Sequence, residues 1–146
     1  MPFTYQHARP SVTVDNVVIG FANDGTKHIL LIKRGRQGTP FYGYWALPGG
    51  FVDENEDLEV AARRELREET HVEAGMMIQV GAYGKPGRDP RGHVISVAYV
   101  TMMQMSQVTF RADDDAKEAK MWPMDALPDL AFDHADIIAD VRKKLP

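Results

Sequence analysis

The sequence predicts an α+β fold, because strand-like segments outnumber helical ones and the two helical segments lie mid-chain and at the end. Its 146 residues are enough to bury a substantial core. Hydrophobic residues make up 44% and charged residues 26%, a balance typical of a globular chain. No repeat and no long linker divides the sequence, so we expect one domain over residues 1–146.

The first half of the chain predicts a β-hairpin, a loop and a short strand. Residues 11–22 and 27–34 are β-branched or apolar runs, and the sequence "NDGT" between them is typical of a hairpin turn. Glycines and a proline mark residues 35–43 as a loop. Residues 44–52 indicate a short strand that breaks at "PGG".

The second half of the chain predicts two helices and three strands. We expect a helix over residues 57–70, with Asp57 as its N-cap. Strands are expected over residues 76–84, 93–105 and 117–124. Residues 132–145 have the pattern of an amphipathic helix, with Ile137, Ile138 and Val141 on its apolar side.

Composition excludes several classes of function. The formal charge of −4 argues against general nucleic-acid binding, although a local basic patch would suffice for a small anion. The absence of cysteine excludes disulfides, thiolate catalysis and cysteine-ligated zinc. No apolar run is long enough to cross a membrane, and the N-terminus lacks the apolar core of a signal peptide. We expect a cytoplasmic, soluble protein that binds neither nucleic acid nor membrane.

The predicted helix over residues 57–70 carries carboxylates on its apolar side. At about 100° per residue, Glu65 and Glu69 project along the stripe that contains Leu58 and Ala62. A solvated Glu–Arg ladder explains the i,i+4 pairs Glu59–Arg63 and Arg64–Glu68, but Glu65 and Glu69 have no cation between them. Buried carboxylates need neutralisation, and a hard divalent cation, Mg²⁺ or Mn²⁺, would supply it. We therefore favour a metal site over a ladder.

The segment before this helix adds a second feature. Gly49 and Gly50 can bring bare backbone close to a ligand or a metal, although such a pair is more often a turn. Five residues separate Gly50 from Glu56, and seven more lead to the run "RELREE" over residues 64–69. This pattern resembles the signature of the Nudix hydrolases. The resemblance implies a Nudix-type α/β/α sandwich with a mixed central β-sheet, and hydrolysis of a nucleoside diphosphate linked to another moiety.

The resemblance also implies roles for individual residues. Glu65 and Glu69 would be the main ligands of Mg²⁺, or alternatively Mn²⁺, and the Gly49 carbonyl would join them. Glu68 would be a further ligand or the base for the attacking water. Nudix enzymes often draw another carboxylate from a later loop. Within residues 111–120 the candidates are Asp113, Asp114, Asp115 and Glu118, of which we choose Asp115; for the others a solvated acidic loop is the simpler explanation.

Two further expectations concern the ends of the signature. The resemblance implies that Glu56 and Arg64 pair and hold the loop against the helix. His71 stands where the family usually has glycine in the left-handed conformation that closes a helix. Histidine tolerates that conformation better than most residues, so we expect a small cost in stability and an intact site; a further helical turn before Gly75 is the alternative.

The sequence outside the signature indicates the substrate. Residues 84–100 and 127–138 are similar to segments of the ADP-ribose pyrophosphatase branch, which implies hydrolysis of ADP-ribose to AMP and ribose 5-phosphate. Guanidinium groups suit phosphate and ribose oxygens, and aromatic rings suit adenine, although buried aromatic rings are more often core. The candidate substrate-binding residues are Arg34, Arg36, Trp45, Arg88, Arg91 and Phe132, with Phe41 and Tyr42 as further aromatic candidates. For Arg88 and Arg91, an Asp89–Arg pair in a solvated turn is an equal alternative. His134 is most simply a helix-start residue.

Other functions remain open at this point. The same segments resemble Nudix-derived regulators, so an ADP-ribose sensor without turnover is one alternative. A housecleaning hydrolase of modified nucleoside triphosphates is another. The complete set of carboxylates favours an enzyme, and the chain leaves no room for an added DNA-binding domain. The resemblance is also compatible with a homodimer.

Overall fold

Two long strands form the centre of the fold. The computed structural model describes residues 2–110 and 116–145. Strands β1 (Ser11–Phe21) and β6 (Val94–Gln104) pair in parallel from Ser11↔Val94 to Phe21↔Gln104. Both are rich in valine, isoleucine and threonine, which pack well on a pleated surface. Residues 13–20 of β1 are all buried, so this strand is covered on both faces.

The remaining strands complete a mixed sheet. They are β2 (Lys27–Arg34), β3 (Trp45–Ala46), β4 (Gly49–Phe51), β5 (Ile78–Tyr83) and β7 (Ala116–Pro123). The strand order is β3-β2-β1-β6-β5, with β4 pairing with β1 and β7 with β2. The β1–β6 pair is parallel and the other pairs are antiparallel. The predicted hairpin is confirmed as β1 and β2, which pair antiparallel from Phe21↔Lys27 to Ile19↔Ile29.

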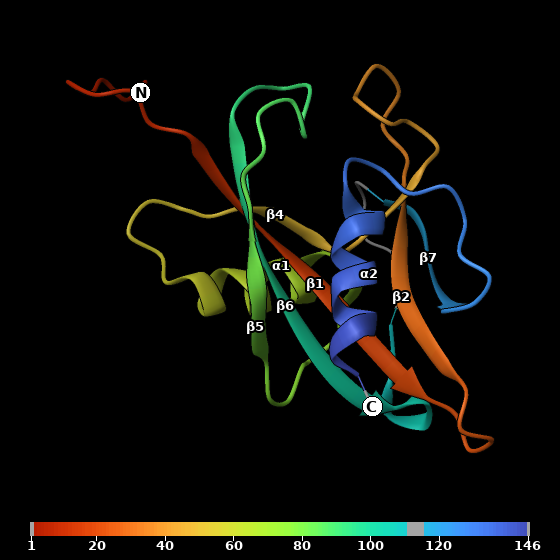
Figure 1. Ribbon diagram of the computed structural model, residues 1–146. Helices are drawn as coiled ribbons and strands as arrows, with labels where there is room; N and C mark the ends of the chain where they lie inside the picture. The colour runs from red at the N-terminus through yellow and green to blue at the C-terminus, as the bar shows by residue number, and fades with distance from the viewer. Residues whose placement is uncertain (1, 111–115, 146) are drawn as a thin grey trace.

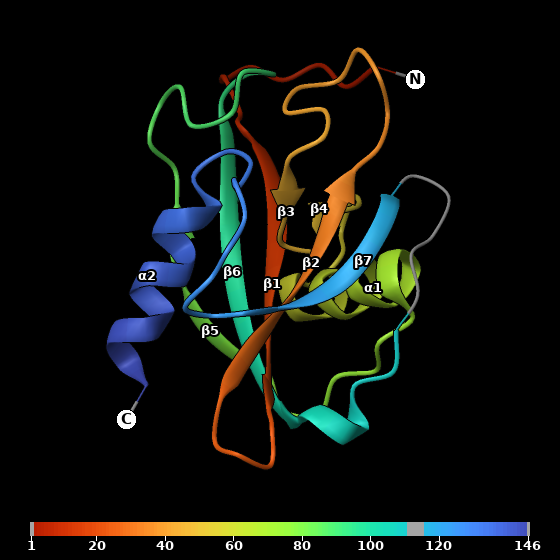
Figure 2. The same cartoon turned by 90° about the vertical axis from the view of Figure 1, so that its right-hand side faces the viewer.

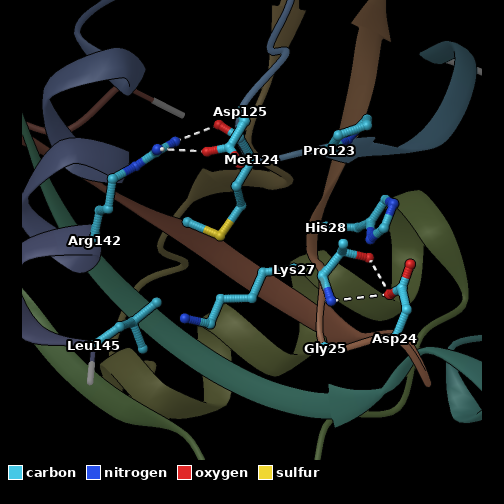
Figure 3. Close-up of a pocket in the computed structure, with 10 residues that line it drawn as sticks. Asp24, Gly25, Lys27, His28, Pro123, Met124, Asp125, Arg142 and Leu145 are labelled. Carbon is cyan, nitrogen blue, oxygen red and sulfur yellow. Dashed lines mark hydrogen bonds and ion pairs between the residues drawn. The ribbon is translucent and has the colours of Figure 1, made fainter.

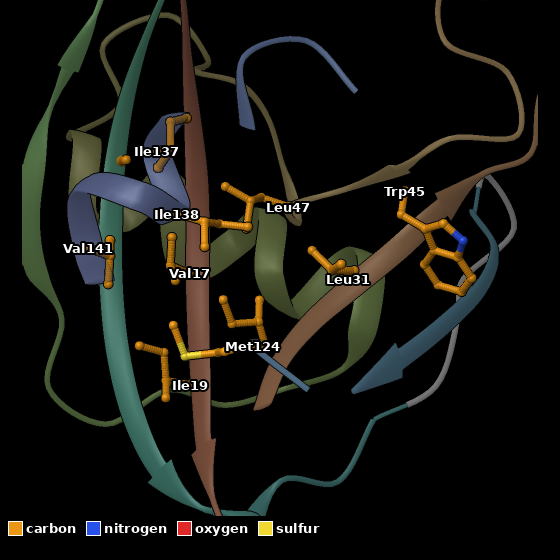
Figure 4. Close-up of a cluster of buried hydrophobic side chains, with 11 residues drawn as sticks. Val17, Ile19, Leu31, Trp45, Leu47, Met124, Ile137, Ile138 and Val141 are labelled. Carbon is orange, nitrogen blue, oxygen red and sulfur yellow. The ribbon is translucent and has the colours of Figure 1, made fainter. Parts of the chain in front are cut away.

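One helix covers each face of the sheet, as Figures 1 and 2 show for α1 (Leu58–Thr70) and α2 (His134–Lys144). Side chains alternate along β1, so Val17 and Ile19 face α2 while Val14 and Val18 face α1. Figure 4 shows the first of these two cores, in which Ile137, Ile138 and Val141 of α2 pack on the sheet. The predicted α/β/α sandwich with a mixed central sheet is confirmed.

The sequence predicts that the strand over residues 44–52 breaks at residues 48–50, and these bounds are wrong. The observed break starts one residue earlier and ends two residues earlier. β4 begins at Gly49, so the chain leaves strand geometry only at Leu47 and Pro48. Gly49 and Gly50 pair with Asp15 and Val14 of β1. A Cβ atom on Gly49 would lie 2.0 Å from the carbonyl oxygen of Val14. Glycine is therefore needed here for close approach of two strands, not for a turn.

Both ends of α1 agree with the sequence. Asp57 is the N-cap, with φ −67° and ψ 146°, and its side chain accepts a hydrogen bond from the Leu58 N–H. His71 ends the helix in the left-handed conformation, with φ 63° and ψ 17°, and its N–H donates to the Arg67 carbonyl. Of the two expectations for His71, the left-handed cap is confirmed, and no further turn of helix precedes Gly75.

The second helix starts later than expected. Phe132 has a φ of 51°, which lies outside the helical region, so α2 starts at His134 and not at residue 132. The 3₁₀ helix η1 (Met105–Gln107), which follows β6, was not predicted. Among the described residues, neither helix is long and apolar enough to span a membrane.

Candidate active site

A cavity of about 110 Å³ lies where the ends of several elements meet. It is lined by β1 and β2, by Leu47 of the β3–β4 turn, by Gly49 and Gly50 of β4, and by Glu69 of α1. Residues 88–91 and the start of α2 close its other side. Four predicted substrate-binding residues line this cavity, namely Arg34, Arg88, Arg91 and Phe132. The chain therefore brings the predicted acidic and basic groups to one place.

Gly50 makes room for the first of the buried carboxylates. A Cβ atom on Gly50 would lie 2.4 Å from Oε2 and 2.5 Å from Cδ of Glu65, which real atoms do not tolerate. The side chain of Glu65 is only 14% exposed, and its Oε1 accepts a hydrogen bond from Arg64 Nη1 at 2.8 Å. The missing side chain of Gly50 is thus the space in which the Glu65 carboxylate lies.

Glu69 is the more deeply buried carboxylate of the pair. Its Oε2 is buried and has no hydrogen-bond partner in the described part of the chain. Burial raises the pKa of Glu69 well above its ordinary value, and the charges of Glu65 and Asp15 raise it further, against a hydrogen bond from the Gly49 N–H. Burial also raises the pKa of Glu65. Burial therefore disfavours the charged form of both carboxylates, and the two side chains share a hydrogen bond.

The donor set fits a divalent cation in part. The orphaned Oε2 of Glu69 and the two neighbouring carboxylates whose pKa values burial raises are features that an oxygen-coordinated cation would resolve. Residues that could hold it are Glu65, Glu69 and Gly49, whose carbonyl does not belong to the ladder with β1. Within residues 2–110 and 116–145, however, no three His, Asp or Glu side chains converge on one point. Glu68, the predicted third ligand, does not complete such a group, because its side chain is 57% exposed and lies 3.2 Å from Arg64 Nη1.

Arg64 is the centre of a clamp that joins α1 to the loop before it. Its Nε and Nη2 donate to the two carboxylate oxygens of Glu56 at 2.7 and 2.9 Å, and Nη2 also donates to the Phe51 carbonyl at 3.0 Å. These hydrogen bonds lower the pKa of Glu56 to about 2 and raise the pKa of Arg64. The Glu56–Arg64 pair expected from the resemblance is present in the structure.

Arg34 and Arg91 form the basic part of the cavity. Their guanidinium carbons lie 5.0 and 5.3 Å from the ring centroid of Phe132, and that of Arg91 lies 4.9 Å from the Phe51 ring. Burial lowers the pKa of Arg34, and so does the charge of Arg91, while Glu69 opposes the shift. Phe132 is thus covered by two cations. We conclude that it supports the arginines and is poorly placed to stack on adenine.

Arg88 differs from its predicted role. Its side chain is 4% exposed, and its Nη2 and Nε bind the two carboxylate oxygens of Asp133 at 2.5 and 2.8 Å. Asp89 instead pairs with Arg91, with Nη2–Oδ2 at 2.6 Å. Arg88 therefore ties the loop over residues 84–93 to the start of α2. Because Asp133 occupies both Nε and Nη2 of this buried guanidinium, the geometry favours a tether over the predicted contact with substrate.

Three other predicted residues lie away from the cavity or cannot be placed. The ring of Trp45 is 8% exposed and packs edge-on against Trp122 at 5.1 Å, so it belongs to the core and not to an adenine site. Figure 4 shows it beside β2. Arg36 is exposed in the loop after β2 and does not line the cavity. Asp115 lies outside the described residues.

Sequence reasoning missed two buried residues of the cavity wall. Asp15 lines the cavity from within β1. His134 is the first residue of α2, as expected, but it also lines the cavity, with Nε2 3.4 Å from Asp15 Oδ1. Burial acts to raise the pKa of Asp15, but His134 and the hydrogen bond from Ser96 outweigh it and hold that pKa below its ordinary value. The available signal was a lone carboxylate inside a β-branched run, because a buried charge needs partners.

A larger pocket of about 730 Å³ lies between the β1–β2 turn and the end of α2 (Figure 3). Its size alone would favour it as a ligand site. However, Asp24 is bonded to Thr26, and Arg142 is bonded to Asp125 and to the Met124 carbonyl. No predicted site residue lines it. The chemistry of the chain therefore lies in the smaller cavity beside Glu69.

Comparison with known proteins identifies the family. The chain belongs to the Nudix family, because the model of the NUDIX domain matches residues 13–141. Within it, the chain is a Nudix pyrophosphohydrolase. It is similar to the ADP-ribose pyrophosphatase of Methanocaldococcus jannaschii, with 42% identity over 137 residues, which make up 94% of this chain and 76% of the relative.

Solved structures agree with this assignment. The NUDIX domain of Shewanella oneidensis NrtR complexed with ADP ribose superposes with a TM-score of 0.86 at 32% identity, covering 96% of this chain and 91% of that one. A bifunctional NMN adenylyltransferase/ADP ribose pyrophosphatase of Francisella tularensis, complexed with AMP and a Mn ion, gives a TM-score of 0.79 at 29% identity. That match covers 96% of this chain and 43% of the bifunctional protein.

Proposed function

We propose that this protein hydrolyses the diphosphate bond of ADP-ribose to AMP and ribose 5-phosphate, with Mg²⁺ or Mn²⁺ as its cofactor. The observation that carries the proposal is a single cavity lined both by Glu69 and by Arg34 and Arg91. A diphosphate has the negative charge to bind the arginines and, through a cation, the carboxylates. The relative named as an ADP-ribose pyrophosphatase supports the choice of substrate.

The acidic side of the cavity would hold the cation. Glu65, Glu69 and the Gly49 carbonyl are the oxygens we assign to it. A bound divalent cation neutralises charge that develops on the diphosphate oxygens and lowers the pKa of water. The Arg64 clamp keeps Glu65 in place, since the Nη1 group that binds Glu65 belongs to a guanidinium fixed by Glu56. The Mn ion in the Francisella tularensis structure supports this assignment.

The basic side would hold the diphosphate. Arg34 and Arg91 donate to its non-bridging oxygens, and the three hydrogen bonds from Arg91 to Asp89 orient the guanidinium before substrate arrives. During hydrolysis the oxygen of water bonds to one phosphorus, and the bond from that phosphorus to the bridging oxygen breaks. The bridging oxygen leaves with the other phosphate. We assign removal of the water proton to Glu68, with Asp115 as the alternative base.

Two other functions remain to be separated by experiment. The complex of NrtR with ADP ribose favours, as a second candidate, a domain that binds ADP-ribose without hydrolysing it. A hydrolase of modified nucleoside triphosphates is the third. We would assay ADP-ribose, NADH, 8-oxo-dGTP and sugar nucleotides with Mg²⁺ and with Mn²⁺. Highest kcat/KM for ADP-ribose supports the proposal; tight binding without turnover selects the sensor, and preference for 8-oxo-dGTP selects the third candidate.

A further inference from the structure

A buried chain of polar groups runs beneath the cavity and ends on the turn before Gly49. The Ser96 hydroxyl donates to Asp15, and Asp15 Oδ1 lies 3.4 Å from Nε2 of His134. On its other side the imidazole accepts a hydrogen bond at Nδ1 from the Leu47 N–H at 3.0 Å. All three side chains are buried. These groups come from β6, β1, α2 and the β3–β4 turn, so this series of polar contacts joins four parts of the fold.

The geometry fixes the tautomer of His134. Since Nδ1 accepts a hydrogen bond from a backbone N–H, the ring proton of the neutral imidazole is on Nε2. That nitrogen faces the Asp15 carboxylate, which can only accept. Asp15 therefore orients the ring, and the ring holds the N–H of Leu47. An unpaired N–H at this buried position would otherwise cost free energy.

The β3–β4 turn is held from both sides immediately before Gly49. His134 binds the Leu47 N–H, and the Asn16 N–H donates to the Pro48 carbonyl at 2.8 Å. Because hydrogen-bonded and non-bonded pairs alternate in an antiparallel ladder, the next pair, Gly49↔Asp15, has its backbone groups turned away from β1. The Gly49 N–H accordingly donates to Glu69. The Gly49 carbonyl likewise points away from β1.

We propose that His134 is a positioning residue for Gly49: through its hydrogen bond to Leu47 it sets the β3–β4 turn so that the backbone of Gly49 meets the carboxylates of α1. The inference rests on the proposed function only in that Gly49, Glu65 and Glu69 hold the cation. His134 acts through Leu47 and not on substrate. Asp15 has an orienting part, since it fixes which nitrogen of the ring accepts.

A purely structural role is the competing explanation, because α2 also packs on the sheet through Ile137, Ile138 and Val141. Two substitutions of His134 separate the explanations. In His134→Asn the amide oxygen takes the place of Nδ1 and keeps the acceptor for Leu47 but loses the contact with Asp15. In His134→Gln the longer side chain reaches the place of Nε2, so it keeps the contact with Asp15 and loses the acceptor. Ile138→Ala, on the same helix and outside the cavity, is the control for lost packing.

The first measurement is Mn²⁺ affinity without substrate, followed by electron paramagnetic resonance of free Mn²⁺. We expect His134→Gln to weaken Mn²⁺ binding about 10- to 100-fold, the size found when groups that orient metal ligands are removed. His134→Asn should keep affinity near that of the wild type, although both substitutions lower thermal stability. Ile138→Ala should lower stability and leave affinity unchanged. Equal affinity in the two His134 variants would overturn the proposal.

Steady-state kinetics with ADP-ribose is the second measurement. His134→Gln should lower kcat at saturating Mn²⁺ and leave KM close to the wild-type value, because the turn acts on the metal site and not on the arginines. If the wild type does not hydrolyse ADP-ribose but the Asn and Gln variants still differ in Mn²⁺ affinity, the proposed substrate fails and this inference stands. If the wild type hydrolyses ADP-ribose but the Asn and Gln variants have the same Mn²⁺ affinity, the proposed substrate stands and this inference fails. A wild-type protein that binds no Mn²⁺ overturns both.

Discussion

The carboxylate of Glu65 lies in the space that a side chain on Gly50 would fill, with Oε2 2.4 Å from the position of a Cβ atom. This relationship links a glycine of β4 to an acidic residue of α1, and it explains why the strand and the helix can approach so closely. It also makes Gly50 a sensitive position, because even one methyl group must displace the carboxylate.

Gly50→Ala should therefore inactivate the enzyme while leaving it folded. Overpacking of this kind costs about 1–3 kcal/mol of stability, but the displaced carboxylate would no longer reach the cation. We expect kcat/KM for ADP-ribose to fall at least about 100-fold, which corresponds to a few kcal/mol of lost electrostatic stabilisation. Gly75→Ala is the matched control, since a Cβ atom there meets nothing within 4 Å. Near-normal turnover of Gly50→Ala would show that the position of Glu65 does not matter.

Glu69→Gln should abolish turnover without lowering the stability of the folded protein. The substitution keeps the size of the side chain and removes a negative charge that the proposed cation needs, so kcat should fall at least about 100-fold. Glu65→Gln should behave alike. Glu59→Gln lies on the outer face, where Glu59 pairs with Arg63 at 3.3 Å, and should retain activity. Metal-free melting temperatures measured by calorimetry complete the test. A lower melting temperature for Glu69→Gln than for the wild type would contradict the idea that repulsion between Glu65 and Glu69 destabilises the metal-free protein.

Local sequence patterns predicted the fold well and the site in part. The hairpin, the capped helix α1 and the acidic stripe depend on residues within a few positions of each other, and all of them are present. The contact between Asp15 and His134 joins opposite ends of the chain, so no local period could reveal it. Trp45 was misassigned because an aromatic residue in a short strand has the same pattern whether it packs on Trp122 or faces a ligand.

The loop over residues 84–93 shows the same limit. Its sequence predicted arginines beside a diphosphate, and Arg91 lines the cavity as expected. The structure adds the partner of Arg88, Asp133, which lies in the segment before α2. Charge and spacing within the loop favoured Asp89 as the partner of either arginine, and only the folded arrangement decides between them.

The stability of the metal-free protein should fall as the pH rises above about 4.5, the ordinary value for Glu69. Because burial raises the pKa of Glu69, the folded protein keeps a proton that the unfolded chain loses, so the free energy of unfolding decreases as the pH passes from the ordinary value through the raised one. Glu69→Gln should reduce this decrease, and the part that remains is due to Glu65, whose pKa burial also raises. Melting temperatures from pH 4.5 to 8 without metal would test it, and saturating Mg²⁺ should flatten the wild-type curve.

Glu56 should act in the opposite direction and in a different range. Arg64 lowers the pKa of Glu56 to about 2, so its contribution to stability is present above 4.5 and is lost as the pH falls from 4.5 towards 2. Glu56→Gln should therefore reduce the acid sensitivity of the folded state. Urea denaturation at pH 3 and at pH 6 gives the comparison; an equal effect of the substitution at both values would mean that the Arg64 clamp does not stabilise the folded protein through this charge.

Arg88→Ala should destabilise the protein more than it alters substrate choice. Removing one partner of a buried ion pair leaves the other charge unpaired, which costs about 3–5 kcal/mol. Asp133→Ala should cost a similar amount, and the double substitution should cost less than the sum, because it leaves no unpaired charge. Free energies of unfolding from urea titrations test this coupling. Additive losses would mean that the Arg88–Asp133 contact contributes nothing as a pair.

Arg91→Ala should change substrate preference in addition to lowering stability. Arg91 is partly exposed, lines the cavity and is oriented by Asp89, so its loss removes a charge-assisted contact to substrate. It also leaves the buried carboxylate of Asp89 without its ion-pair partner, which lowers stability but acts equally on all substrates. Such a contact is worth about 1.5–3 kcal/mol, or roughly 10- to 100-fold in kcat/KM. We expect the loss to be larger for ADP-ribose than for 8-oxo-dGTP, because only ADP-ribose has a terminal ribose that the Arg91 loop can bind together with the diphosphate. The ratio of the two kcat/KM values, in wild type, Arg91→Ala and the exposed control Arg67→Ala, decides the point. A ratio that Arg91→Ala leaves unchanged would remove Arg91 from substrate selection, and Arg34, which also lines the cavity, would be tested in the same way.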